Sequence, residues 1–264
     1  MPILSFATGN LWRFEQKSNR ASILKYIAKL PVDGIELTFA KNQQLFDFKP
    51  TRQHLRLLHS KEYVTIHAPF SLSKDAANTD ELEKALERIQ ELKEQVNAKY
   101  IVIHPHQMPP TTLLKKYKLP ILTENMRKRR YKIQTFANGQ NVTETTRQKR
   151  LMTHPILETT MDKTRAGLCM DVGHAYAWNQ TEIEHLVKRF KPRIKQIHLH
   201  SVYRNKDHRQ FLRKHTQEYI RSIQPALDLN VPIVIEEDFK RLNLPRVRRE
   251  IRLIKDMLQT KTKP

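Results

Sequence analysis

The sequence predicts an α/β protein built as a single (β/α)₈ barrel, in which eight parallel strands close into a sheet inside a ring of helices. The chain has 264 residues, and a barrel of this kind typically needs about 250. Short β-rich segments alternate with helical patterns along the whole chain, which predicts a parallel sheet. There are eight such segments, the number that closes a barrel of the TIM type. No linker or repeat divides the sequence, so residues 1–264 are interpreted as one domain.

The expected strands are short and mostly apolar. They span residues 3–7, 34–39, 64–68, 100–104, 121–124, 167–172, 194–198 and 232–236. The clearest helical pattern follows the third strand, where apolar residues recur at three- and four-residue steps: Leu82, Leu86, Ile89, Leu92 and Val96. A short helix is expected over residues 111–117, and Thr181 with Glu184 predicts a capping box at the start of a later helix.

One connection is much longer than the others. It runs from Glu124 to Gly167 and soon reaches four consecutive basic residues, Arg127, Lys128, Arg129 and Arg130. Chain that follows a barrel strand lies on the face where active sites sit. We therefore expect these basic side chains beside the site.

Composition limits the cellular setting. The single cysteine, Cys169, allows no disulfide within the chain, and the sequence shows neither a signal peptide nor an apolar run of membrane-spanning length. We expect a soluble, cytoplasmic protein with no membrane partner and no obligate protein partner. Cys169 itself is expected to be a buried core residue of the sixth strand.

The formal net charge of +21 is the most unusual bulk property. A polyanionic partner is the natural interpretation, with nucleic acid first and phosphorylated metabolites second. A generally basic proteome is the alternative, because net charge bears on partners and does not define a site.

Polar residues of metal-binding type lie at the ends of six consecutive expected strands. They are His67, His104, Glu124, Asp171 with His174, His198, and Glu236. Taken alone, a histidine or glutamate there is more often a hydrogen-bonded structural residue. Six together would be costly to desolvate unless they were paired or bound to metal. Imidazole and carboxylate suit divalent ions such as zinc, so the pattern predicts a metal centre in the barrel mouth.

These residues resemble the ligand pattern of the xylose isomerase-like superfamily of barrels, over nearly the whole chain. Two branches compete. Sugar isomerases and epimerases of the superfamily hold one metal, here on Glu124, Asp171, His198 and Glu236, which would leave Glu36 to contact sugar hydroxyls. The endonuclease IV family, which repairs abasic DNA, adds strand-end histidines and further zinc ions. A non-catalytic nucleic-acid binder is a third alternative.

Three features favour the endonuclease IV branch. His67 and His104 are both present, as the family's additional metal requires. The segment 167–177 is similar to the family's sixth-strand motif. The stretch from Phe39 through Lys41, Asn42, Gln43 and Gln44 resembles the loop that this family inserts into the DNA minor groove, and Phe70 matches its wedging aromatic residue.

The sequence also departs from that family. A third metal would use His174, Asp207 and His208, but the last two are adjacent and Arg209 stands where the histidine is usual. Gln44 replaces the usual arginine and His106 the usual glycine.

The resemblance implies two or three Zn²⁺ ions, with Mn²⁺ as an alternative, and Glu124 as a catalytic residue that bridges two of them. Activated water would cleave double-stranded DNA on the 5′ side of an abasic site. The DNA backbone would be held by basic residues at the site mouth, namely Arg127, Lys128, Arg129, Arg130 and Arg204.

Overall fold

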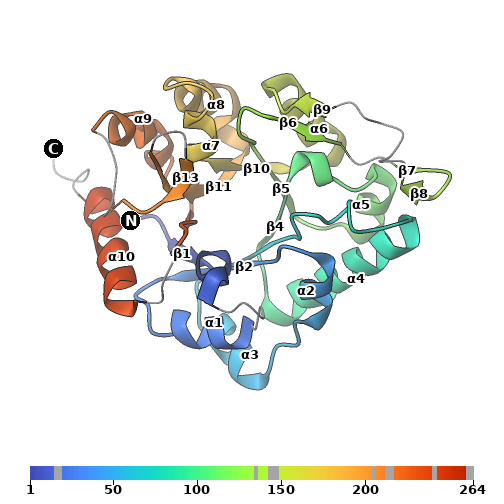
Figure 1. Cartoon of the computed structure of the whole chain (residues 1–264), viewed down its shortest axis with the longest axis horizontal. Helices are drawn as coiled ribbons and strands as arrows, with labels where there is room; N and C mark the ends of the chain where they lie inside the picture. The colour runs from blue at the N-terminus through green and yellow to red at the C-terminus, as the bar shows by residue number, and fades with distance from the viewer. Residues whose placement is uncertain are drawn as a thin grey trace.

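The eight expected strands form a closed parallel barrel, which confirms the predicted fold class (Figure 1). The computed structural model describes residues 1–14, 20–133, 136–141, 149–203, 206–211, 217–239 and 243–259. Around the barrel the strands are β1 (Leu4–Ala7), β2 (Gly34–Thr38), β3 (Tyr63–His67), β4 (Tyr100–Ile103), β5 (Ile121–Glu124), β10 (Gly167–Asp171), β11 (Ile194–Leu199) and β14 (Ile233–Ile235), and β14 pairs with β1. Each expected strand is therefore present, with ends that match the expectation or differ from it by one residue.

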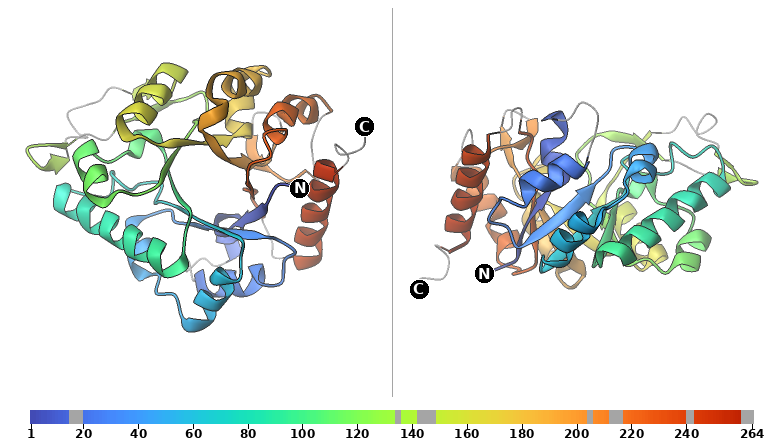
Figure 2. Two further views of the ribbon diagram at one scale, coloured as in Figure 1. Left: turned by 180° about the vertical axis from the view of Figure 1, so that it is seen from behind. Right: turned by 90° about the horizontal axis from the view of Figure 1, so that it is seen from below.

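Helices surround the barrel on its outer side (Figures 1 and 2). The α-helices are α1 (Arg20–Ile27), α2 (Asn42–Asp47), α3 (Arg52–His59), α4 (Thr79–Val96), α5 (Thr111–Tyr117), α6 (His154–Thr164), α7 (Val172–Tyr176), α8 (Glu182–Phe190), α9 (Gln217–Leu227) and α10 (Leu244–Gln259). The 3₁₀ turns are η1 (Thr8–Phe14), η2 (Pro105–Gln107) and η3 (Lys191–Arg193). Among the described residues, no helix is both long and apolar enough to cross a bilayer.

Helix starts show where local sequence rules held and where they failed. The apolar face expected in α4 is buried, and the Asn78 side chain caps this helix by accepting from the N–H of Glu81 at 2.9 Å. The capping box expected at Thr181 is wrong. Within the described chain Thr181 makes no cap bond, and its hydroxyl donates instead to Oδ1 of Asn179 at 2.9 Å.

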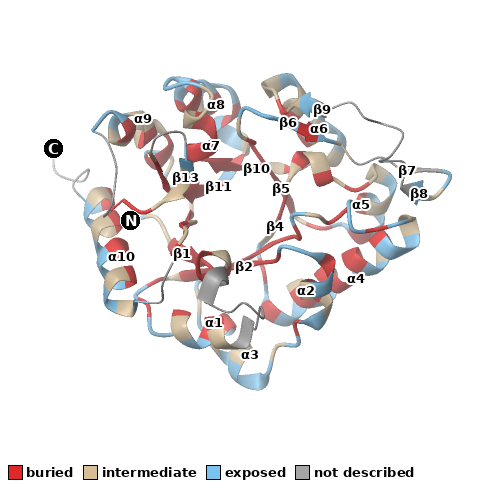
Figure 3. Ribbon diagram, in the orientation of Figure 1, coloured by how far each residue is buried: buried red, intermediate tan, exposed pale blue. Residues whose placement is uncertain are grey.

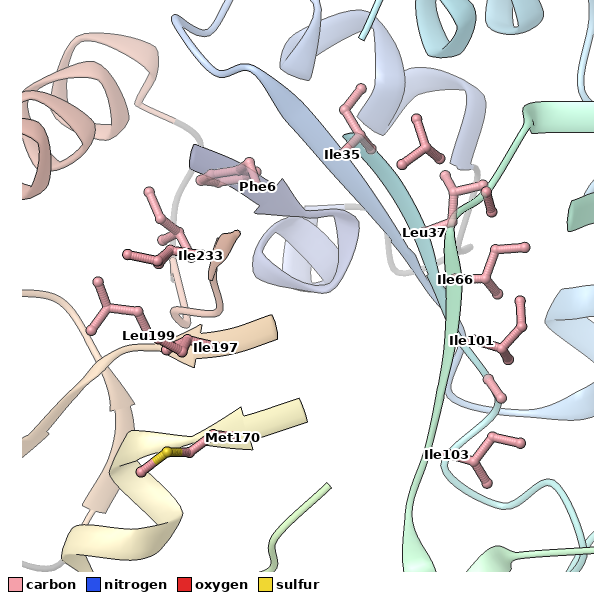
Figure 4. Packing of buried hydrophobic residues seen from close by; sticks show 14 of the residues in the cluster. Phe6, Ile35, Leu37, Ile66, Ile101, Ile103, Met170, Ile197, Leu199 and Ile233 are labelled. Atoms are coloured by element: carbon pink, nitrogen blue, oxygen red, sulfur yellow. The ribbon is translucent and has the colours of Figure 1, made fainter. Parts of the chain in front are cut away.

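Alternation along the strands separates two layers of side chains. Successive strand residues face opposite sides of a sheet, so every second residue shares a face. Residues such as Ile35, Leu37 and Ile66 belong to the main apolar cluster between barrel and helices (Figures 3 and 4). The other face carries a separate small cluster of Val102, Leu122 and Cys169. The metal-type residues His104, Glu124 and Asp171 each follow one of these three by two positions, so they share the inward face.

Two hairpin segments extend the barrel at the ends of β5 and β11. After β5, β6 (Arg130–Lys132) pairs with β9 (Lys149–Leu151), and β7 (Phe136–Ala137) pairs with β8 (Gln140–Asn141). The tip of the β7–β8 hairpin reaches the start of α4, where the N–H of Thr79 donates to the carbonyl of Gly139 at 2.8 Å (Figure 1). After β11, β12 (Ser201–Tyr203) pairs with β13 (Lys206–Arg209).

Candidate metal centre

The residues expected to bind metal come together at one end of the barrel. His67, Glu124 and Asp171 are the last residues of β3, β5 and β10. His104 and Glu236 directly follow β4 and β14, and His198 lies near the end of β11. Because parallel strands all end on the same side, these side chains converge on the carboxyl-terminal mouth of the barrel.

Glu124 is the hub of this cluster. Its Oε2 lies 3.1 Å from Nε2 of His67, 3.4 Å from Nε2 of His104 and 3.7 Å from Nδ1 of His198. Its other oxygen, Oε1, lies 3.0 Å from Nδ1 of His174. One carboxylate with 1% exposure therefore contacts four imidazoles from four segments of the chain.

A second group lies beside the first and consists of Asp171, His198 and Glu236, whose candidate ligand atoms are all within 4.8 Å of one another. Nδ1 of His198 is 3.0 Å from Oε2 of Glu236, yet this buried nitrogen makes no hydrogen bond to any described residue. A nitrogen and a carboxylate oxygen this close without a shared hydrogen bond are suited to facing a common cation.

The spacing of these atoms is compatible with a shared divalent ion. Two donors on one tetrahedral zinc lie about 3.3 Å apart, given bonds of about 2.0–2.1 Å. The separations of His67 and His104 from Oε2 of Glu124, and of His198 from Glu236, fall between 3.0 and 3.4 Å. The donor set of neutral imidazole and carboxylate is also the one that zinc and manganese accept.

The carboxylates of the cluster are held ionised. Burial alone would raise the pKa of Glu124, but the charges and hydrogen bonds of His104, His174 and His67 outweigh it and keep this pKa well below its usual range. Burial likewise opposes ionisation of Glu236, and the neighbouring His198 lowers its pKa to about 2. Anionic oxygens are thus available at the mouth near neutral pH.

The histidines share this electrostatic environment. Burial would lower the pKa of His174, but Asp171 and Glu124 raise it to about 9. Burial dominates at His104, whose pKa is lowered. In the ion-free protein, protons on histidine therefore partly balance the buried carboxylates, and a divalent cation that binds here must displace them.

The segment expected to hold a third metal adopts an unusual backbone. Neighbouring strand residues normally point to opposite faces, which would separate Asp207 from His208. His208 instead has φ of 50°, in the left-handed region. Both side chains consequently approach His174: Oδ2 of Asp207 is 3.8 Å from its Nε2, and the His208 ring is 5.7 Å from its ring.

Asp207 has a second neighbour that the sequence did not reveal. Nη1 of Arg127 lies 2.8 Å from Oδ2 of Asp207. Among the described residues, the possible three-residue metal groups include His208 with His174 and His200 but do not include Asp207. The third candidate metal position therefore combines the carboxylate of Asp207, the histidines His174 and His208, and the guanidinium of Arg127.

The residues expected to enter the minor groove divide into two kinds. Phe70 is 40% exposed and packs on the rings of His67 and His104, with centroids 4.9 and 5.4 Å away. It therefore lies at the site mouth. Asn42, Gln43 and Gln44, interpreted as part of a loop, instead lie in helix α2.

Within that segment the side chains differ in exposure. Asn42 is buried and donates to the carbonyl of Leu72 at 3.0 Å, which ties the segment after β2 to the one after β3. Gln44 accepts from the N–H of Ala40 at 2.7 Å, whereas Lys41 and Gln43 are exposed.

Basic side chains of the connection after β5 lie on the surface. Lys128, Arg129 and Arg130 are exposed, and the guanidinium of Arg129 stacks 4.7 Å from the centre of the Tyr131 ring. Tyr131 packs in turn on His106, which stacks on His104. The segment therefore adjoins the His67–His104 side of the centre. Arg204 lies outside the described residues.

Four buried polar residues, Asn125, Gln196, His200 and Glu36, surround the candidate ligands, and the sequence pattern indicated a role for Glu36 alone. Asn125 exchanges two hydrogen bonds of 2.8 Å with the backbone of Asp171. Gln196 and His200 flank His198 at two-residue spacing, so strand alternation places all three on the inward face. Glu36, an expected sugar contact in the isomerase interpretation, is fully buried, with Oε2 accepting from Thr65 and Gln196 at 3.0 and 2.8 Å.

The chain belongs to the family described as Xylose isomerase-like TIM barrel, whose model matches residues 24–252. Within this superfamily the sequence resemblance left two branches open, an endonuclease and a sugar isomerase or epimerase. No curated protein sequence matches the chain.

Solved structures similar to this one fall on both sides of that division. Endonuclease IV from Thermus thermophilus has 16% identity and a TM-score of 0.64, with 98% of this chain and 100% of that chain covered. D-allulose 3-epimerase from Methylomonas sp. has 12% identity and a TM-score of 0.63, covering 97% and 98%. A D-tagatose 3-epimerase-like protein has 14% identity and a TM-score of 0.62, covering 98% and 97%. At these identities the likeness extends to the fold alone.

Proposed function

We propose that the chain is a metal-dependent phosphodiester hydrolase that cleaves duplex DNA at abasic sites, as an endonuclease IV does. The observation that carries the proposal is the placement of His67 and His104 on Oε2 of Glu124, at 3.1 and 3.4 Å. A single-metal site on Glu124, Asp171, His198 and Glu236 would need no ligand from these two histidines. A second ion bound by them would share Glu124 with the first.

Bound divalent ions would lower the pKa of a water molecule and stabilise charge on the phosphate oxygens. The chain's own residues prepare the site for this chemistry. Glu124 stays ionised and central, while Asn125 fixes the backbone of Asp171 from both sides. Asp171 in turn accepts from the N–H of His174 at 2.6 Å, which fixes the first turn of α7.

The surroundings of the centre suit a nucleic acid. Lys128, Arg129 and Arg130 are exposed on the connection after β5, and phosphate contacts from such residues supply affinity without sequence preference. Phe70 offers a partly exposed ring beside His67 and His104. An apolar side chain there can fill the space of a missing base, and a missing base reduces the cost of unstacking.

A sugar or sugar-phosphate epimerase is the second candidate. Asp171, His198 and Glu236 form a group that could hold one ion by itself, with Glu124 adjacent. In that case His67 and His104 would serve the hydrogen bonding of Glu124 and not a second ion. The two candidates therefore differ in the number of ions per chain.

The deciding experiment combines ion counting with a cleavage assay. The nuclease proposal expects at least two ions per purified chain, falling by one in the His67→Ala/His104→Ala double variant, and cleavage of a duplex carrying a reduced abasic analogue that stops on chelation. His54→Ala/His59→Ala, two histidines of α3 outside the centre, is the matched control. One ion per chain, unchanged in the double variant, with no cleavage, would reject the nuclease and favour the epimerase.

A further inference from the structure

His200 lies between β11 and β12, fully buried, and both nitrogens of its ring have neighbours. Nδ1 is 2.9 Å from the backbone N–H of His208 and 3.3 Å from the carbonyl oxygen of Ser201. If Nδ1 carried the ring proton, that proton would meet the backbone N–H of His208, whose nitrogen is only 2.9 Å away, and two donors would face each other. Nδ1 is therefore the acceptor for His208, and the ring proton lies on Nε2.

Nε2 of His200 points at a metal-type carboxylate. It lies 3.1 Å from Oδ1 and 3.2 Å from Oδ2 of Asp171. With the proton on Nε2, His200 donates to Asp171 and orients it. One ring thus connects Asp171 to the backbone at His208.

The backbone that His200 holds is the left-handed residue of β13. Residues with a side chain seldom adopt this conformation, and His208 does so with φ of 50°. Its N–H donates to His200 while its side chain and that of Asp207 approach His174. His200 is thus the acceptor for the N–H of this bend, while the His208 ring also lies 2.9 Å from the carbonyl oxygen of Glu236 through Nδ1.

The fit of His200 also explains Gly173. A Cβ on Gly173 would lie 1.9 Å from Cε1 of the His200 ring and 2.6 Å from each of its nitrogens. Only glycine leaves room for the ring directly beneath the turn that carries Asp171 and His174. On another side the His208 ring stacks on His200 with centroids 4.3 Å apart and planes 27° apart.

This stacking argues against His200 as a metal ligand. An ion lies close to the plane of each imidazole that binds it, and two nearly parallel stacked rings do not direct their nitrogens at one point. The nitrogens of His200 are in addition taken by His208 and Asp171. Of His174, His200 and His208, the first and the last are therefore the candidate ligands, and the ring of His200 supports them.

We propose that His200 is a positioning residue that couples the two halves of the metal centre, through Nε2 to Asp171 and through Nδ1 to the bend at His208. Residues that support metal ligands in this way typically change metal affinity by about 10–100-fold when they are replaced. The proposal concerns metal binding only, so its outcome does not depend on which substrate the site takes.

Two substitutions separate the two contacts. The amide of glutamine reaches about as far as Nε2 of histidine, and that of asparagine about as far as Nδ1. His200→Gln should keep the support of Asp171 and lose the acceptor for His208, whereas His200→Asn should do the reverse. His200→Ala should lose both, with His59→Ala, on the exposed end of α3, as the control.

The measurement is cobalt binding to the metal-stripped full chain, followed by visible absorption and by titration against a chelator. We expect His200→Ala to weaken cobalt binding by at least about tenfold and to change the absorption spectrum. His200→Gln should recover most of the affinity of the tightest ion, and His200→Asn should not. Unchanged affinity and spectrum in His200→Ala, or no cobalt binding by the wild-type chain, would overturn the proposal.

A second test uses Gly173 and needs no loss of a polar group. Gly173→Ala should disturb the same contact by steric clash, and the Gly173→Ala/His200→Ala double variant should bind cobalt no more weakly than His200→Ala alone. Additive losses would show that the two positions act separately and would reject the coupling. Circular dichroism of each variant distinguishes weaker binding from loss of the fold.

Discussion

The guanidinium of Arg127 lies 2.8 Å from Oδ2 of Asp207, and the same oxygen lies 3.8 Å from Nε2 of His174. The connection after β5 thus places a fixed positive charge on the one carboxylate of the third candidate metal position. A guanidinium stays protonated at all relevant pH values. Any ion held by Asp207 and His174 must compete with it or accept it as a close neighbour.

This relationship predicts that Arg127 weakens binding of a third ion. Replacing Arg127 by glutamine should raise the number of zinc ions that survive mild chelation from about two towards three per chain, because Asp207 loses its competing cation. Elemental analysis after graded chelation measures this. Lys128→Gln, an exposed neighbour, is the control. An unchanged ion count in Arg127→Gln would mean that the guanidinium does not compete.

Glu124→Gln tests the hub of the centre. The substitution keeps the shape of the side chain and removes the charge that faces His67, His104 and His174. Cleavage of abasic DNA should fall by more than about tenfold, which corresponds to at least about 1.4 kcal/mol of barrier. The barrel should remain folded, because its main apolar cluster lies on the outer face.

The matched control for that variant is Glu91→Gln, an exposed glutamate of α4 paired with Arg88. It removes one carboxylate charge without touching the centre. Retention of more than about a tenth of the wild-type rate in Glu124→Gln would contradict a bridging role, since loss of a group that organises metal costs several kcal/mol.

Ion-free protein should lose stability as pH rises towards 9. Burial opposes protonation of His174, but Asp171 and Glu124 raise its pKa from 6.5 to about 9. A raised histidine pKa adds stability that is fully present below pH 6.5 and disappears as pH rises through about 9. Thermal unfolding of chelator-treated protein across this range measures the effect.

Metal affinity should change in the opposite direction. An ion that binds His174 displaces its proton. Zinc affinity should therefore increase by up to about tenfold per pH unit until the pH reaches the raised pKa of His174, about 9. His174→Asn should show a shallower slope in a zinc competition assay. Parallel slopes in wild type and variant would indicate that His174 releases no proton on binding.

Phe70→Ala should weaken binding to abasic DNA more than binding to intact duplex. The ring is 40% exposed beside the two histidines, where it can fill the space left by a missing base. Fluorescence anisotropy with the two duplexes measures the ratio of the affinity for abasic DNA to that for intact DNA. Phe70→Leu should retain part of the preference for abasic DNA. Equal losses of affinity for both duplexes would show that Phe70 does not fill the space of the missing base.

Affinity for undamaged duplex should fall steeply with salt. A chain of net charge +21 that contacts about six phosphates should lose about 10³-fold in affinity between about 50 and 200 mM salt. An Arg129→Gln/Arg130→Gln variant should show a shallower slope. A flat salt dependence, or no binding at low salt, would favour the epimerase.

The barrel and the convergence of the candidate ligands on its inward face could be predicted from the sequence because both depend on short-range regularities. Val102 and His104, Leu122 and Glu124, and Cys169 and Asp171 are two residues apart, and strand alternation puts each pair on one face whatever the rest of the chain does. Parallel strands then bring their ends together. The same rule applies to His200, two residues after His198, for which no role was predicted.

Other features could not be predicted because they depend on residues distant in sequence. Asn42, expected at a DNA-binding loop, is buried and donates to the carbonyl of Leu72. Arg127, expected to face DNA, forms an ion pair with Asp207. Neither pairing is marked by spacing or composition.

The sequence by itself thus determined the strand order, the inward face of each strand and the six strand ends that meet at the mouth, since these follow from alternation and parallel pairing. Only the tertiary structure decided how those side chains are supported and which of them compete. The left-handed turn at His208 exists because His200 accepts its N–H, and His200 fits because residue 173 has no side chain. That arrangement depends on three segments packing together, which no local pattern encodes.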